Sequence, residues 1–268
     1  MANDGMDEGH SEPHQCSEDL FLDGRLRLRQ PVKGYRAGTD ALLLAAASQT
    51  GGRICDLGAG IGTVGLTLAM RGAGDVLLVE REPVFADCAQ ANIAEADLGA
   101  RVRLIRADVF DRKAFLREPL LADQSCDGVA TNPPYEQALR GRRTPSPLKH
   151  AAHAMQGGDL AHWLTAATRL LRSGGMLTLI HRADKLADVL AALPARLGGV
   201  HALPVQAQRD EAATRIVISA VAASRAPLVL LSPLVLHGAD GRFTPEAEAL
   251  HKGRAALTMR PGPQYLVF

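Results

Sequence analysis

The sequence predicts an α/β fold in which helices cover both faces of a mostly parallel β-sheet. Within residues 53–221, short apolar runs of strand character alternate with amphipathic helical segments. This alternation is typical of parallel sheets, because parallel neighbours need a crossover connection. A glycine-rich turn at 58–62 joins the first of these strands to the next helix. The 268 residues are 47% hydrophobic, which is enough for a buried core.

The chain begins with an acidic segment. Residues 1–19 carry six acidic residues and no lysine or arginine, and they lack hydrophobic periodicity. We therefore expect a disordered tail at 1–19, followed by a single domain at 20–268. Beyond the tail, 30 basic and 23 acidic residues remain, for a net charge of +7. This balance permits a polyanionic partner without requiring one.

The domain opens with a strand in which Leu26 and Leu28 alternate with arginines. The alternation predicts a half-buried strand with a basic outer face, formed by Arg25, Arg27 and Arg29. A glycine-bounded loop follows. Thr39 or Asp40 can then cap an alanine- and leucine-rich helix that ends near Ser48.

The central elements follow in regular order. Strands are predicted at 53–57, 76–80, 102–105, 128–131, 176–181 and 215–221, and helices at 62–71, 82–97, 159–172 and 183–196. Gly174 is expected to end the third helix. Beyond residue 221, an Asp240-Gly241 turn and a short helix opened by Thr244-Pro245 form a C-terminal extension.

Several classes of protein are excluded by composition. The four cysteines are far apart and have neither metal-ligand spacing nor a disulfide framework. No apolar run approaches the ~18 residues of a membrane span, and the N-terminus has no hydrophobic leader. We expect a reduced, cytoplasmic protein without a metal centre; its oligomeric state stays open.

The turn after the first central strand is a candidate ligand site. Asp56 precedes three glycines at alternate positions, Gly58, Gly60 and Gly62. Glycines let the backbone turn sharply and approach a ligand, and open α/β sheets bind ligands at this edge. A dinucleotide and S-adenosylmethionine both fit. Asp56 favours S-adenosylmethionine, because a carboxylate is a poor neighbour for a pyrophosphate and a good one for a cation.

Acidic residues also end the next two strands. Glu80 is suited to accept hydrogen bonds from two ribose hydroxyls, which both cofactor classes would use. Asp108 could accept a hydrogen bond from an adenine amino group. An ordinary helix cap or surface charge is the alternative for either residue.

The fourth central strand runs into a tetrapeptide, Asn132-Pro133-Pro134-Tyr135. Together with the glycine turn and the second-strand acid, it resembles Rossmann-like class I methyltransferases that act on planar, conjugated nitrogens. The resemblance implies S-adenosyl-L-methionine as cofactor. It also implies that the Asn132 side chain and the Pro133 carbonyl accept the two N–H bonds of an amino group, while Tyr135 stacks on the ring.

The segment upstream of the glycine turn narrows the resemblance. Residues 34–44 are similar to those of bacterial tRNA (adenine-N6)-methyltransferases acting on valine tRNA. The resemblance implies a tRNA substrate. It also implies a cofactor role for Gly38, Thr39 and Asp40, whose alternative role is purely structural, as a helix cap. After the tetrapeptide, a basic loop is expected to border the substrate entrance and bind RNA phosphates through Arg140, Arg142, Arg143 and Lys149. The basic strand face formed by Arg25, Arg27 and Arg29 is expected to bind RNA phosphates as well.

Other functions stay open from the sequence. Protein glutamine methyltransferases of the release-factor type share the tetrapeptide, but only 55 residues precede Asp56, which leaves little room for their helical N-terminal domain. Another RNA base is a further possible acceptor. A non-catalytic RNA-binding module would not need these acidic residues, and a nicotinamide-dependent oxidoreductase would leave Asn132-Pro133-Pro134-Tyr135 unexplained.

Overall fold

The computed structural model describes residues 15–32, 36–134, 159–260, 262 and 266–267. Its central sheet has the order β10-β8-β9-β7-β6-β3-β4-β5, and β11 also pairs with β8. The strands of this sheet are β3 (Arg53–Leu57), β4 (Asp75–Glu80), β5 (Val102–Arg106), β6 (Cys126–Thr131), β7 (Leu171–Arg182), β8 (Leu197–Gln208), β9 (Ala213–Ala222), β10 (Val229–Leu230) and β11 (Leu234–His237).

The sheet is mostly parallel, as predicted. Strands β7, β6, β3, β4 and β5 run parallel, whereas β9 is antiparallel to both β7 and β8. The predicted bounds of β3 are those observed, and β4, β5, β6, β7 and β9 begin and end within a few residues of their predictions. The long strand β8 was not predicted as a strand.

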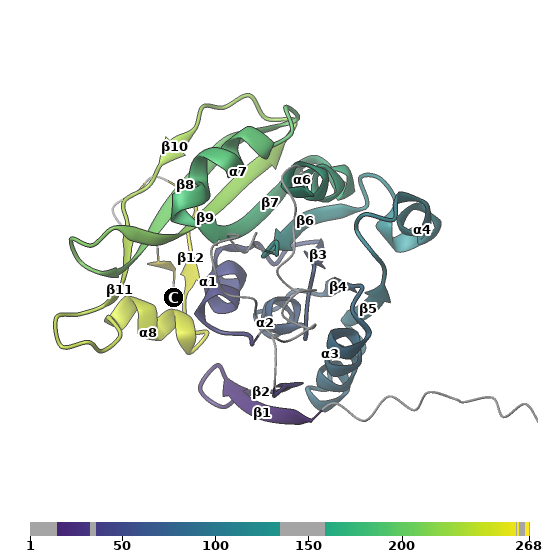
Figure 1. Ribbon diagram of the computed structural model, residues 1–268, viewed down its shortest axis with the longest axis horizontal. Coiled ribbons are helices and arrows are strands. Elements are labelled where there is room, and N and C mark those ends of the chain that lie inside the picture. Colours follow the sequence, from purple (N-terminus) through teal and green to yellow (C-terminus); the bar gives the residue numbers. More distant parts are fainter. Residues whose placement is uncertain (1–14, 33–35, 135–158, 261, 263–265, 268) are drawn as a thin grey trace, which may run out of the picture.

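Helices pack on both faces of the sheet (Figure 1). The helices are α1 (Thr39–Ala47), α2 (Thr63–Met70), α3 (Pro83–Glu95), α4 (Arg112–Arg117), α6 (Asp159–Leu170), α7 (Leu186–Ala192) and α8 (Pro245–His251). Alternate strand residues point to opposite faces, so Ile54 joins the core beneath α1–α3 while Leu57 joins the core beneath α6 and α7. This two-sided burial makes the central strands almost wholly apolar.

The N-terminal prediction was wrong at its boundary. β1 (Cys16–Phe21) and β2 (Leu26–Pro31) form an antiparallel hairpin, so residues 16–19 belong to the fold. β1 escaped the sequence pattern because its alternation is between exposed and half-buried side chains, and its backbone bonds come from β2. Residues 1–14 lie outside the described part of the chain.

Three helix ends also differ from prediction. Gly38 is the N-cap of α1, and no side chain caps that helix. α6 ends at Leu170 and passes directly into β7, well before Gly174. The helix predicted at 183–196 begins with a short 3-10 turn at Ala183–Lys185, and α7 then ends at Ala192. Thr244 caps α8 as predicted, since its side chain accepts a hydrogen bond from the Ala247 N–H.

The C-terminal extension packs against the N-terminal part of the domain. It comprises β11, α8, and a two-stranded pairing of β12 (Ala256–Leu257) with β13 (Leu266–Val267), and both α8 and β12 contact α1. Within the described residues, no helix is long and apolar enough to cross a membrane.

Candidate active site

The glycine turn forms the floor of a pocket at the carboxyl edge of the sheet. Gly58, Gly60 and Gly62 all have left-handed backbone conformations, with φ of 75°, 57° and 88°. A side chain at Gly58 would also collide with Trp163, because an added Cβ would lie 2.8 Å from its ring. Conformation and space therefore both require glycine there. The Gly58 and Ala59 N–H groups donate to the Val79 carbonyl at 2.9 Å, which fixes the turn against β4.

Asp56 lies beneath this turn and is 2% exposed. Its Oδ2 accepts a hydrogen bond of 2.8 Å from the Gly65 N–H in the first turns of α2. Burial raises the pKa of Asp56 to about 7; the Gly65 bond opposes this shift and the nearby Glu80 adds to it. A cation at the pocket would favour the ionised form of this carboxyl.

Glu80 connects the end of β4 to the glycine turn. Its Oε2 accepts a bond of 2.8 Å from the Gly60 N–H, and its Oε1 accepts from the Arg81 and Glu82 N–H groups at 2.9 and 2.8 Å. Burial raises the pKa of Glu80, and these three backbone N–H groups oppose the shift. The carboxylate is thereby held in one orientation at the pocket wall.

Asp108 lies on the loop after β5 and also lines the pocket. Its Oδ1 accepts from the Phe110 N–H at 2.9 Å, and its Oδ2 lies 3.4 Å from a guanidinium nitrogen of Arg81. The three strand-end acids predicted from the sequence, Asp56, Glu80 and Asp108, therefore meet at one pocket.

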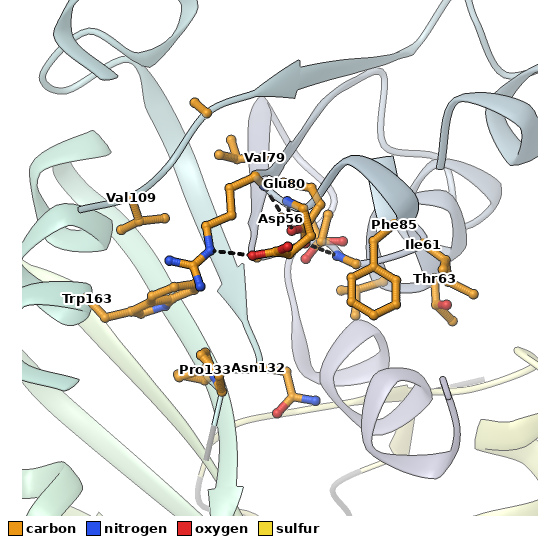
Figure 2. Close-up of a pocket in the computed structure, with 18 of the residues that line it drawn as sticks. Asp56, Ile61, Thr63, Val79, Glu80, Phe85, Val109, Asn132, Pro133 and Trp163 are labelled. Atoms are coloured by element: carbon orange, nitrogen blue, oxygen red, sulfur yellow. Dashed lines mark hydrogen bonds and ion pairs between the residues drawn. The ribbon is translucent and has the colours of Figure 1, made fainter. Parts of the chain in front are cut away.

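The predicted acceptor tetrapeptide reaches the same pocket. Asn132, Pro133 and Pro134 line it at the carboxyl end of β6, beside the end of β3. Figure 2 shows Asn132 and Pro133 at this pocket. The register pairs Leu57 with Thr131, so the residues that follow each strand, Gly58 and Asn132, are neighbours across the two strands. Tyr135 lies outside the described residues.

Apolar side chains complete the pocket, and sequence reasoning missed them as site residues. In Figure 2, Trp163 and Phe85 lie on opposite sides of the group formed by Asp56 and Glu80. Phe110 is 40% exposed and its ring centroid lies 5.8 Å from that of Trp163. Their positions soon after strand-end acids could have indicated Phe85 and Phe110. Trp163 carried only the signal of an apolar helix stripe.

The pocket suits a ligand with cationic, hydroxylated and aromatic parts. The acidic side chains suit the cationic and hydroxylated parts, and the apolar walls suit the aromatic part. Thr63 gives a further sign of fit. The residue lines the pocket and is 3% exposed, and its buried hydroxyl has no hydrogen-bond partner among the described residues. A buried orphan hydroxyl is costly unless a ligand or water satisfies it. The chemistry of these residues matches S-adenosylmethionine.

The Gly38-Thr39-Asp40 turn lies between two residues that line the pocket, but its side chains contact other elements. Ala37 and Ala41 line the pocket, whereas the side chains of Thr39 and Asp40 contact distant elements. Thr39 Oγ1 lies 3.0 Å from His251 Nε2 of α8, and Asp40 Oδ2 accepts from Arg215 Nε of β9 at 2.9 Å. These contacts anchor α1, so a cofactor role for this turn stays a prediction.

Of the two predicted basic surfaces, the structure describes the strand face and not the loop. Arg27 and Arg29 each form ion pairs with Glu18 and Glu95 at 3.0–3.7 Å, which compensates the charge of the β2 outer face. Arg25 instead donates to the backbone carbonyls of Leu22 and Lys252. The loop arginines Arg140, Arg142 and Arg143, with Lys149, lie outside the described residues. No group of three or more potential metal ligands occurs in the described part of the chain.

Comparisons with known proteins agree with this site. Residues 33–207 match the family model for the methyltransferase small domain. A tRNA1(Val) (adenine(37)-N6)-methyltransferase from Porphyromonas gingivalis is 28% identical over 240 residues, which cover 85% of this chain and 91% of that protein.

Solved structures show the same fold. A predicted O-methyltransferase from Agrobacterium tumefaciens is 32% identical with a TM-score of 0.68, covering 81% of this chain and 97% of that one. The Thermus thermophilus 16S rRNA N2 G1207 methyltransferase, solved with S-adenosylmethionine and guanosine, is 17% identical with a TM-score of 0.52 and covers 78% and 50%. At that identity the likeness concerns the fold alone.

The strand-end acids, the glycine turn and the acceptor motif therefore have a common explanation. The chain is an enzyme whose cofactor is S-adenosyl-L-methionine, and the strand-end acids and the glycine turn line one pocket. It has a Rossmann-like class I methyltransferase fold and belongs to the methyltransferase small domain family.

Proposed function

We propose that this enzyme methylates the exocyclic amino group of an adenine in RNA, with tRNA as the RNA and the cytoplasm as the place of action. The observation that carries the proposal is the position of Asn132-Pro133-Pro134 in the cofactor pocket, beside the glycine turn. The name of the Porphyromonas gingivalis relative supports the adenine-N6 acceptor and the tRNA.

An exocyclic amino nitrogen is a poor nucleophile because its lone pair is delocalised into the ring. The Asn132 side-chain oxygen and the Pro133 carbonyl can accept its two N–H bonds, and proline stiffens the backbone that presents the carbonyl. Two acceptors favour a tetrahedral nitrogen with an available lone pair, and they stabilise the positive charge that develops on it.

The bound cofactor supplies an electrophilic methyl group on a sulfonium. No strong base is needed beside Asn132, because a methylated, cationic amino group is acidic enough to release its extra proton to water. A hydroxyl acceptor would instead need a base at the same place. The two-acceptor arrangement thus favours N-methylation over the O-methylation named for the Agrobacterium tumefaciens protein.

Mass spectrometry of tRNA nucleosides, with and without the gene, tests the proposal. We expect N6-methyladenosine to be lost on deletion and restored by the unsubstituted gene but not by Asn132→Ala. Purified enzyme should methylate tRNA from the deletion strain. Unchanged tRNA nucleosides together with methylation of a glutamine-containing release factor would replace this proposal with the protein substrate.

A further inference from the structure

Trp163 is the single tryptophan of the chain, and it forms one wall of the pocket. It lies on α6, and the whole residue is 6% exposed. The ring lies so close to Gly58 that the turn tolerates no side chain there, and it packs at a tilt of 60° against Phe110. The indole is therefore wedged between the glycine turn and the loop that carries Asp108.

Thr131 fixes the indole in this position. The Thr131 hydroxyl is fully buried; it donates to the Leu57 carbonyl at 2.8 Å and accepts from Trp163 Nε1 at 2.9 Å. Leu57 immediately precedes Gly58, and Thr131 immediately precedes Asn132. One hydroxyl thus links three elements: the end of β3, the end of β6, and α6.

We propose that Trp163 contacts the bound cofactor and that Thr131 is a positioning residue, which holds the indole and the glycine turn in the arrangement that binds it. The inference rests on the cofactor and not on the identity of the methyl acceptor. Its physical basis is the one orientation that the hydrogen bonds allow. An indole N–H can only donate, so the Thr131 oxygen must accept from it and direct its own hydrogen to Leu57.

The contact can be measured by tryptophan fluorescence, because no other tryptophan contributes. Titration with S-adenosylhomocysteine should change the emission of Trp163 with the same dissociation constant as calorimetry gives. Binding by calorimetry with unchanged emission would overturn the contact. Absence of binding by calorimetry would overturn the cofactor site and the proposal together.

The role of Thr131 is tested by Thr131→Val, which keeps the shape and removes the hydroxyl. We expect S-adenosylhomocysteine affinity to fall roughly tenfold and the emission maximum of the free enzyme to shift, because the buried indole N–H loses its acceptor. Thr131→Ser should restore both properties. Unchanged affinity in Thr131→Val would refute the positioning role.

Thr168→Val is the matched control. Thr168 lies on α6, the helix that carries Trp163, and is buried like Thr131. Its hydroxyl donates within the helix to the Leu164 carbonyl at 2.6 Å. Its substitution should change neither affinity nor emission maximum, and an equal loss there would show a general effect of a buried hydroxyl. Trp163→Phe should also weaken binding, and adding Thr131→Val to it should cost less than in the unsubstituted enzyme, since the two residues share one interaction. Fully additive losses would contradict the link.

Discussion

Replacing Glu80 by glutamine should weaken cofactor binding strongly while leaving the shape of the pocket intact. The carboxylate accepts three backbone N–H groups, one on Oε2 and two on Oε1. Glutamine offers one accepting oxygen and one NH2 group. Whichever way the amide lies, its NH2 faces at least one backbone N–H and cannot accept from it.

The magnitude follows from the bonds lost. For binding, the bond that counts is the one to the ribose: the substituted side chain loses one charged acceptor for its hydroxyls, and a hydrogen bond to a charged group contributes about 1.5–3 kcal/mol. A loss of that size in binding corresponds to roughly 10- to 150-fold weaker affinity. The substitution can also remove the hydrogen bond that the Gly60 N–H donates to this side chain. A disturbed glycine turn would weaken ligand binding too, in the same direction as the lost ribose bond.

Calorimetry with S-adenosylhomocysteine at pH 8 measures this loss without turnover. Glu95→Gln is the control, since Glu95 lies on α3, pairs with Arg27 and Arg29, and does not line the pocket. Thermal unfolding of both variants separates binding from folding. Glu80→Gln with the affinity of the unsubstituted enzyme would refute the assignment of Glu80 to the ribose.

Three further predictions concern catalysis, pH and RNA. Asn132→Ala should slow single-turnover methyl transfer by about 10²–10³ while changing cofactor affinity little, because its acceptor acts mainly in the transition state; full activity would remove the mechanism. Since the pKa of Asp56 is about 7, its carboxyl ionises between pH 6 and pH 8, so the dissociation constant for S-adenosylmethionine should fall about tenfold over that range and Asp56→Asn should remove the dependence. Neutralising Arg140, Arg142 and Arg143 together should lower the log–log salt slope of tRNA binding by about 2–3, and an unchanged slope would return that loop to an ordinary solvated surface.

Local patterns were enough to predict that the strand-end acids and the glycine turn meet at one pocket. Asp56, the alternate glycines and Glu80 each follow or end a strand whose apolar residues are consecutive, so the sequence shows both the strand and its edge. Parallel pairing then places these edges together, because all carboxyl ends of a parallel sheet face the same way. No contact between distant residues had to be known for this inference.

The surroundings of the site depend on contacts that no local pattern contains. The contacts that anchor Thr39 and Asp40 join them to residues 212 and 175 positions away, on α8 and β9, while their cofactor role stays a prediction. The sequence predicts a basic outer face for β2, but Arg27 and Arg29 pair there with Glu18 of β1 and with Glu95 of a helix far along the chain. A charge pattern alone cannot show compensation by another element.

The order of the strands explains why one pocket can hold both reacting groups. β3 has β4 on one side and β6 on the other, so the chain leaves the turn after β3 in one direction and returns on the opposite side with Asn132. The reversal opens a crevice at the ends of β3 and β6. Because Leu57 pairs with Thr131, the glycine turn and the proposed amino-group acceptors both begin one residue after this pair. Because β3 and β6 are both buried on two faces and joined by the Thr131 hydroxyl, that spacing is held by the sheet rather than by loops. Methyl transfer between two bound groups benefits from this kind of fixed approach, since holding the partners in line removes part of the entropic barrier.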